Sequence, residues 1–154
     1  MTPLVLDVQL LLYAVFNSYT EHSVAHAWFE VVLNDPASLV GLPNHSLLGF
    51  IRLATKPRPH FTPLSMEDAL EQVRAWIDWP NVFVPQPSDG HIRRVADLLR
   101  LTHGNHELVS DAHLAALAME HRATMCTHDT DFARFVGLSV FDPLLPPTSP
   151  TGGI

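Results

Sequence analysis

The chain has 154 residues, of which 47% are hydrophobic and 16% are charged. This composition supplies enough apolar material for one buried core and excludes intrinsic disorder as the general state of the chain. The formal net charge of −7 argues against unassisted tight binding to nucleic acids, because such binding usually depends on a basic surface.

The expected compartment follows from the cysteine content and the hydropathy of the sequence. Cys126 is the single cysteine, which excludes an intrachain disulfide and suits a reducing environment. No apolar run approaches the ~18–20 residues needed to cross a bilayer, and no signal peptide is evident. We therefore expect a cytoplasmic protein without membrane association.

The first predicted element is a short apolar strand, Leu4–Leu6, which ends at Asp7 and is followed at once by an apolar helix. Burying an unpaired polar group costs on the order of 2–7 kcal/mol, and a charged group costs more. A helix N-terminus would offset part of this cost for Asp7, and a divalent cation shared with other carboxylates would offset the rest.

Further helices follow in the middle of the chain. They are predicted over residues 21–34, 43–55 and 66–79, and a fourth is opened by Ser88 and Asp89. Ser65 is expected to cap the third of these helices. The apolar side of the first is assigned to Val24, Ala27, Trp28, Val31 and Val32.

Short strands alternate with these helices. They are predicted over residues 37–42, 82–84 and 140–141. The alternation predicts the α/β class with a parallel sheet. We expect one domain over residues 1–143 and a Pro/Gly-rich C-terminal tail over residues 144–154.

Residues 109–135 place three aspartates around an apolar helix and a short buried strand. The helix is rich in alanine, which indicates close approach to a flat surface such as a sheet. Asp111 stands at the helix start, where a carboxylate is favoured. Asp129 and Asp131 follow the strand predicted over residues 123–127.

Ligands of parallel α/β sheets bind beyond the carboxyl ends of the strands, where Asp129 and Asp131 are expected. Side chains at positions i and i+2 can also turn the same way. Ordinary turn and cap roles would explain these two aspartates on their own. The matching aspartate at the end of the first strand, Asp7, favours a divalent-cation site instead.

Three segments together resemble PIN-domain ribonucleases. They are LVLDVQLLLYAV at residues 4–15, LPNHSLLGFIRLAT at residues 42–55 and LVSDAHLAALAMEHRATMCTHDTDFARF at residues 108–135. The closer resemblance is to the VapC-like toxins of bacterial toxin–antitoxin pairs. It implies a PIN-like α/β/α sandwich with a central parallel sheet, and a Mg²⁺-dependent endoribonuclease (Mn²⁺ in place of Mg²⁺ is an option) that hydrolyses RNA phosphodiester bonds. It also implies a cognate antitoxin and a homodimer.

The resemblance carries catalytic and metal-binding roles over to four aspartates, Asp7, Asp111, Asp129 and Asp131. Asp7 and Asp111 are expected to contact the metal. Asp129 and Asp131 are expected to hold metal-bound water or a second ion.

The sequence departs from the family pattern in two places. Gln9 stands where the family usually has asparagine or serine, and the helix predicted over residues 43–55 lacks the acidic residue often found there. Gly49 or Phe50 stands near that place. A catalytically weak PIN-like module that binds RNA or protein is therefore the alternative function. A third reading, a Mg²⁺-dependent phosphohydrolase of small molecules, would normally require an aspartate in place of Gln9.

Overall fold

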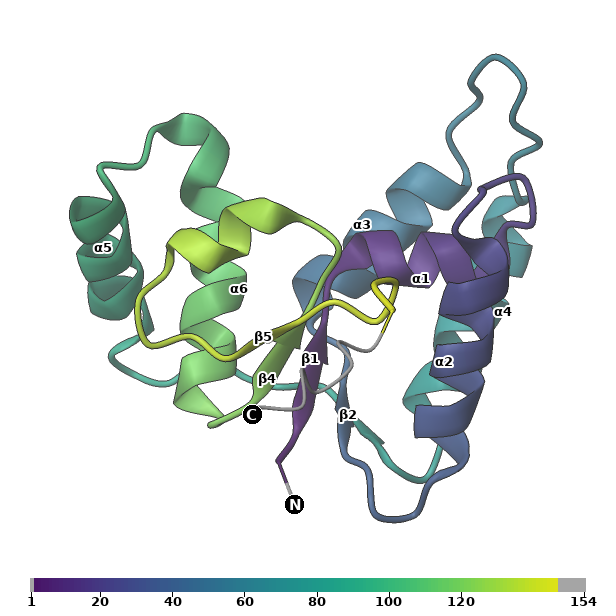
Figure 1. Ribbon diagram of the computed structural model, residues 1–154. Helices are drawn as coiled ribbons and strands as arrows, with labels where there is room; N and C mark the ends of the chain where they lie inside the picture. The colour runs from purple at the N-terminus through teal and green to yellow at the C-terminus, as the bar shows by residue number, and fades with distance from the viewer. Residues whose placement is uncertain (1, 147–154) are drawn as a thin grey trace, which may run out of the picture.

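Five short parallel strands form the centre of the protein in the computed structural model, which describes residues 2–146 (Figure 1). Their order across the sheet is β3-β2-β1-β4-β5. The bounds are β1 Leu4–Leu6, β2 Val40–Gly41, β3 Val82–Phe83, β4 Thr124–Cys126 and β5 Val140–Phe141. Parallel neighbours need crossover connections, and helices supply them.

Six α-helices cover the two faces of this sheet (Figure 1). They are α1 Val8–Val15, α2 His22–Asn34, α3 Asn44–Ala54, α4 Met66–Ile77, α5 His91–Thr102 and α6 Val109–Glu120. Helices α1–α4 share one hydrophobic core, whereas α5 and α6 share a second core on the opposite face. Two 3-10 helices, η1 His106–Leu108 and η2 Thr130–Arg134, flank the sixth helix and the fourth strand. The predicted α/β/α sandwich is confirmed.

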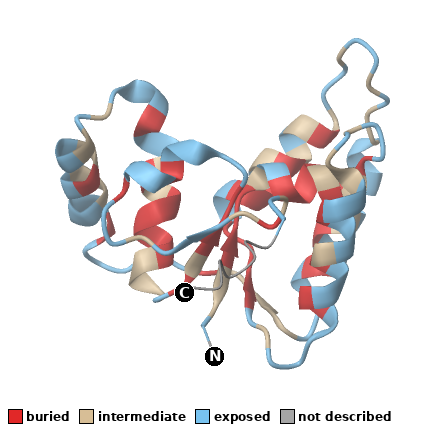
Figure 2. Ribbon diagram, in the orientation of Figure 1, coloured by how far each residue is buried: buried red, intermediate tan, exposed pale blue. Residues whose placement is uncertain are grey.

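The central strand β1 and its neighbour β4 are buried on both faces, as parallel strands between helices must be (Figure 2). Val5 and Leu6 of β1 and Met125 and Cys126 of β4 are fully shielded from solvent. Burial raises the pKa of the Cys126 thiol to about 12, so this cysteine acts as a small apolar core residue. The alanines of α6 are buried against this part of the sheet, which confirms the close approach predicted from their number.

The predicted apolar side of α2 is wrong for three of its members. Val24 and Val31 are 51% and 67% exposed and Ala27 is exposed too, whereas Ala25 and Phe29 are buried. The helix is turned so that the Phe29 ring packs edge-on against the Trp76 ring of α4, at 5.7 Å between ring centroids. Burying this aromatic ring removes more apolar area from water than burying a valine would.

The second strand is shorter than predicted. Asp35 accepts hydrogen bonds from the Ala37 amide and the Ser38 hydroxyl, so a turn takes up residues that were assigned to the strand. Pairing begins only at Val40, opposite Leu4 of β1. Most of the predicted tail, residues 147–154, lies outside the described residues. No helix within residues 2–146 has the length and apolar character needed to span a bilayer.

The core residue Phe50 offers a test of this packing. Its ring has no exposed surface and lies 4.8 Å from the Trp76 ring, centroid to centroid. We expect Phe50→Ala to lower the free energy of unfolding by about 3–5 kcal/mol, because it leaves a cavity. Leu48→Ala on the same helix is the control, since Leu48 is 66% exposed and should change stability by no more than about 0.5 kcal/mol. Equal losses in urea denaturation would contradict this assignment of the core.

Candidate metal centre

Asp7 lies at the carboxyl end of β1 and caps the N-terminus of α1. Its Oδ1 atom accepts a hydrogen bond from the Val8 amide, and its Oδ2 atom accepts one from the Thr127 hydroxyl, each at 2.8 Å. The residue is only 7% exposed. Burial raises its pKa and the charge of Asp129 adds to this, although the two hydrogen bonds act in the opposite direction.

Thr127 is the residue that the sequence analysis missed. Its buried hydroxyl donates to Asp7 and accepts a hydrogen bond from the Asp129 amide at 3.0 Å. Leu6 pairs with Cys126 in the sheet, so the next residue of each strand, Asp7 and Thr127, stand opposite one another. Recognising Thr127 therefore requires knowing that the first and fourth strands are neighbours.

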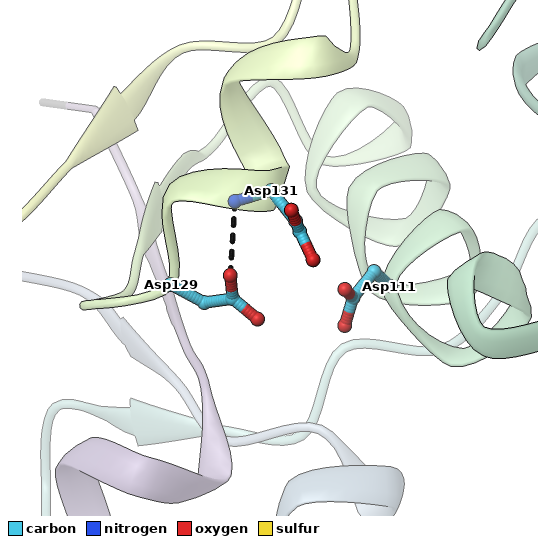
Figure 3. A group of neighbouring side chains, drawn as sticks. All are labelled: Asp111, Asp129 and Asp131. Atoms are coloured by element: carbon cyan, nitrogen blue, oxygen red, sulfur yellow. Dashed lines mark hydrogen bonds between the residues drawn. The ribbon is translucent and has the colours of Figure 1, made fainter.

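Asp111, Asp129 and Asp131 converge beside this pair. One carboxylate oxygen of each lies within 4.8 Å of those of the other two. Asp111 points from the first turn of α6 toward Asp129 and Asp131, which come from the segment after β4 (Figure 3). Asp129 also accepts a hydrogen bond from the Asp131 amide at 2.9 Å, so the cap role considered for it is real and coexists with the cluster.

The electrostatics of the cluster suit a bound cation. The pKa of Asp111 is raised from 3.8 to about 6, first by burial and then by the charges of Asp129, Asp7 and Asp131. A divalent cation would relieve this repulsion. Clustered carboxylate oxygens are the donors that hard cations such as Mg²⁺ and Mn²⁺ prefer. The residues present therefore fit a metal of this class.

The helix that lacks an acidic residue, α3, borders the other side of Asp7. Ser46 is buried and donates a hydrogen bond to the Leu6 carbonyl at 2.8 Å, so it anchors the helix start to β1. Phe50 belongs to the core, and a side chain at Gly49 would meet Val8 at 3.1 Å. His45 is exposed and lies close enough to Asp7 for its charge to lower the pKa of that carboxyl.

Comparison with known proteins points to one family. A PIN domain family model matches residues 4–138. The chain is 38% identical over 138 residues to Ribonuclease VapC33 of Mycobacterium tuberculosis, which covers 90% of this chain and 96% of that protein. It is 39% identical over 134 residues to Ribonuclease VapC37 of the same organism, with 87% and 92% covered.

Solved structures agree on the fold. A structure of VapBC2 from Rickettsia felis bound to a DNA fragment from its promoter matches with a TM-score of 0.67 at 13% identity, covering 92% of this chain and 98% of that one. A structure of DNA-bound VapBC from Salmonella typhimurium matches with a TM-score of 0.66 at 17% identity, covering 93% and 99%. At these identities the likeness shows the fold alone.

Replacing Thr127 tests the link between the two strand ends. Thr127→Val keeps the shape but removes the hydroxyl that serves Asp7 and the Asp129 amide. We expect a loss of about 1–3 kcal/mol in the free energy of unfolding, because both partners stay in place without the hydroxyl. Thr124→Val in the preceding strand β4 is the control, since among the described residues that hydroxyl meets only the Ser139 hydroxyl, at 3.3 Å. Equal stability of the two variants would contradict the proposed bridge.

The raised pKa of Asp111 predicts a pH effect on the metal-free protein. The folded state binds a proton there more tightly than the unfolded chain does, so the stabilisation is complete below about pH 4 and is lost as the pH rises through 6. Asp111→Asn should therefore gain stability relative to the wild type between about pH 4 and pH 7 in EDTA. A difference that does not change with pH in thermal unfolding would refute the assignment.

Proposed function

Because the chain belongs to the PIN-domain family, as one of its VapC ribonucleases, we propose that it hydrolyses RNA phosphodiester bonds with Mg²⁺ as the toxin of a toxin–antitoxin pair. The observation that carries the proposal is the convergence of Asp111, Asp129 and Asp131 beside the buried Asp7. These carboxylates meet at the carboxyl edge of a parallel sheet, where α/β proteins bind their ligands.

We assign the metal to Asp111, Asp129 and Asp131, whose oxygens converge. When bound, Mg²⁺ supplies Lewis-acid stabilisation of the phosphate and lowers the pKa of a water molecule. Asp7 adds negative charge beside these three carboxylates. Each of its oxygens accepts one hydrogen bond and keeps a second lone pair, which can accept a hydrogen bond from a water molecule. A cation held beside Asp111 would offset the negative charges that contribute to its raised pKa and would favour its ionised form. Mn²⁺ should substitute for Mg²⁺, because both prefer oxygen ligands.

The proposed partners are RNA, a cognate antitoxin and a second copy of the chain, acting in the cytoplasm, where RNA is available. Solved structures of similar fold include a toxin–antitoxin complex from Klebsiella pneumoniae. On this chain Val24 and Val31 of α2 and Leu48 of α3 are apolar and exposed, which suits the docking of an amphipathic antitoxin segment. Arg52 at the end of α3 would meet acidic groups of that segment.

A binding module without catalysis is the second candidate, and α3 is the observation that favours it. Within the described chain, this helix contributes no carboxylate to the site, and the overall charge of −7 disfavours RNA binding. The same assay separates the two candidates, because only a nuclease cuts RNA in a metal-dependent manner.

Cleavage of total RNA by the purified protein, with Mg²⁺ and with EDTA, tests the proposal. We expect end mapping to show defined cuts only with the metal. Asp111→Asn and Asp129→Asn should each lower the rate by about a hundredfold or more, because stabilisation by the metal is worth several kcal/mol. Asp97→Asn is the matched control, since its side chain is 71% exposed on α5 and, within residues 2–146, pairs only with Arg100.

Cleavage in EDTA, or cleavage at the wild-type rate by the Asp111→Asn and Asp129→Asn proteins, would contradict the proposed metal site. Binding of RNA without any cleavage in Mg²⁺ or Mn²⁺ would favour the binding module.

A further inference from the structure

The loop of residues 55–65, which joins α3 to α4 and which we call the arm, projects from the body of the protein (Figure 1). At its tip the Phe61 amide donates a hydrogen bond to the Arg58 carbonyl at 3.2 Å. The Phe61 ring also packs against the buried Phe16 ring, at 4.7 Å between centroids. These contacts hold the side chains of the arm in defined positions.

The arm is basic, although the protein as a whole is acidic. It contains Lys56 and Arg58, and no aspartate or glutamate occurs between Asp35 and Glu67 along the sequence. Neither cation forms a salt bridge within residues 2–146. The Arg58 guanidinium lies over the Phe61 ring, with its Cζ atom 4.1 Å from the ring centroid. The arm therefore presents positive charge that no nearby carboxylate neutralises.

The protein satisfies the Arg58 guanidinium incompletely. Its Nη2 atom donates to the Tyr19 hydroxyl at 3.3 Å and to the Leu53 carbonyl at 3.5 Å, and both distances are longer than is usual for such bonds. Among the described residues, the buried Nε atom has no partner, and Nη1 has none either but is open to solvent. A phosphate group offers the acceptor oxygens that these free donors match.

A hollow opens between the arm and the loop that follows α1. Its volume is about 290 Å³, near the lower limit for ligand pockets, which suits one nucleotide at a time. It is lined by Ser18, Tyr19, Arg58, Pro59, His60 and Phe61. A ring and a guanidinium therefore face the same hollow.

Aromatic rings connect the arm to the metal centre. Tyr19 lies 6.3 Å from Phe61 and 5.0 Å from Tyr13, centroid to centroid. Tyr13 lies 6.4 Å from the ring of His128, the residue before Asp129. These spacings fall within the range of about 4.5–7 Å for interacting rings, and none of the four residues is buried. The four rings form a continuous series, which we call the aromatic track.

The charges along the aromatic track differ between its two ends. Burial raises the pKa of Tyr13, and the charges of Glu21, Tyr19, Asp7 and Asp142 add to this effect. Tyr13 is therefore an uncharged ring close to carboxylates, which suits the uncharged face of a base better than a phosphate. The cations of the arm favour phosphates at the other end.

Single-stranded RNA has the chemistry that this surface would recognise, because bases of any sequence stack on aromatic rings and phosphates bind arginine and lysine. We propose that the RNA on one side of the scissile phosphate follows the aromatic track, stacks on Tyr13 and Tyr19, and places a phosphate at Arg58. Lys56 supplies a second positive charge. This inference rests on the proposed nuclease function and assigns the substrate a path away from the metal centre.

Binding without cleavage tests the cations of the arm. The probe is fluorescein-labelled oligouridine of about 12 nucleotides, a usual length for single-strand sites, measured by fluorescence anisotropy with Ca²⁺ in place of Mg²⁺. Each phosphate contact contributes about 0.7 to the slope of log affinity against log salt concentration, so Arg58→Gln and Lys56→Gln should each reduce the slope by about that amount. Arg74→Gln is the control, because it removes an equal charge from α4, where Arg74 pairs with Glu71 and Asp78.

Two substitutions of Tyr19 test the rings. Tyr19→Leu removes the aromatic face, whereas Tyr19→Phe keeps it and loses only the hydroxyl. We expect Tyr19→Leu to lower the affinity for oligouridine by at least about fivefold, the smaller value for the loss of one stacked base, and Tyr19→Phe to bind nearly as the wild type does. An abasic oligomer keeps the phosphates but offers no bases, so both variants should bind it equally.

Cleavage tests the direction of the path. RNAs with one fixed cut site are extended by single nucleotides on either side of the cut, and kcat/KM is measured with Mg²⁺. The wild type should gain from extension on one side, and Arg58→Gln should lose that gain. Arg74→Gln should keep it.

Several results would overturn the inference. They are an unchanged salt slope in both Arg58→Gln and Lys56→Gln, equal affinity of the wild type for abasic and complete oligouridine, and no gain from extension on either side. Equally tight binding of a polyglutamate peptide of the same length would assign the surface to a protein partner instead. If Tyr19→Leu does not fold, photocrosslinking of the wild type to 4-thiouridine RNA decides, and an absence of crosslinks at Tyr13 and Tyr19 rules out the path.

The inference and the proposed function fail in different ways. Metal-dependent cleavage by a protein whose RNA binding ignores Arg58 and Tyr19 removes the path and leaves the nuclease. Binding that depends on these two residues, without cleavage of any RNA, removes the nuclease and leaves the path. Absence of binding to any RNA removes both.

Discussion

The hydrogen bond between the Asp7 carboxylate and the Thr127 hydroxyl is the contact on which the site depends. It joins the carboxyl ends of β1, the central strand of the sheet, and its neighbour β4. The same hydroxyl accepts a hydrogen bond from the Asp129 amide, and the Asp129 carboxylate accepts one from the Asp131 amide. The buried Thr127 hydroxyl therefore helps to position Asp7, Asp129 and Asp131, because each hydrogen bond in this series restrains the residue that makes the next one. Asp111 is added from α6, whose alanines let the helix lie close to the sheet.

Burying Asp111 and placing it among other carboxylates both disfavour its charged form, and its raised pKa reflects these two effects in that order. The repulsion among these carboxylates favours the binding of a cation, because the positive charge of the cation offsets it. The net charge of −7 also implies that a bound cation aids RNA binding. The negative surface repels RNA phosphates until a cation neutralises part of its charge.

The sequence predicted those features that depend on local patterns. Asp7 and Asp129 could be placed after strands because short apolar runs precede them, and Asp111 could be placed at a helix start. Features that depend on which strands are neighbours could not be read in this way. Thr127 matters only because β4 lies beside β1, a pairing between residues 120 positions apart.

Two further features show the same limit. His91 forms hydrogen bonds with both Glu120 and His113 of α6, although it comes 29 residues before Glu120 along the sequence. The orientation of α2 was misjudged because periodicity alone did not show that Trp76, from a distant helix, would take Phe29 as its partner.

A crystal structure of the protein soaked in Mn²⁺, with anomalous diffraction to locate the ion, tests the central claim most directly. We expect an anomalous peak within coordination distance of oxygens of Asp111, Asp129 and Asp131, with Asp7 beside it and still hydrogen-bonded to Thr127. A fully soaked crystal with no peak there, or with its strongest peak away from these aspartates, would contradict that claim.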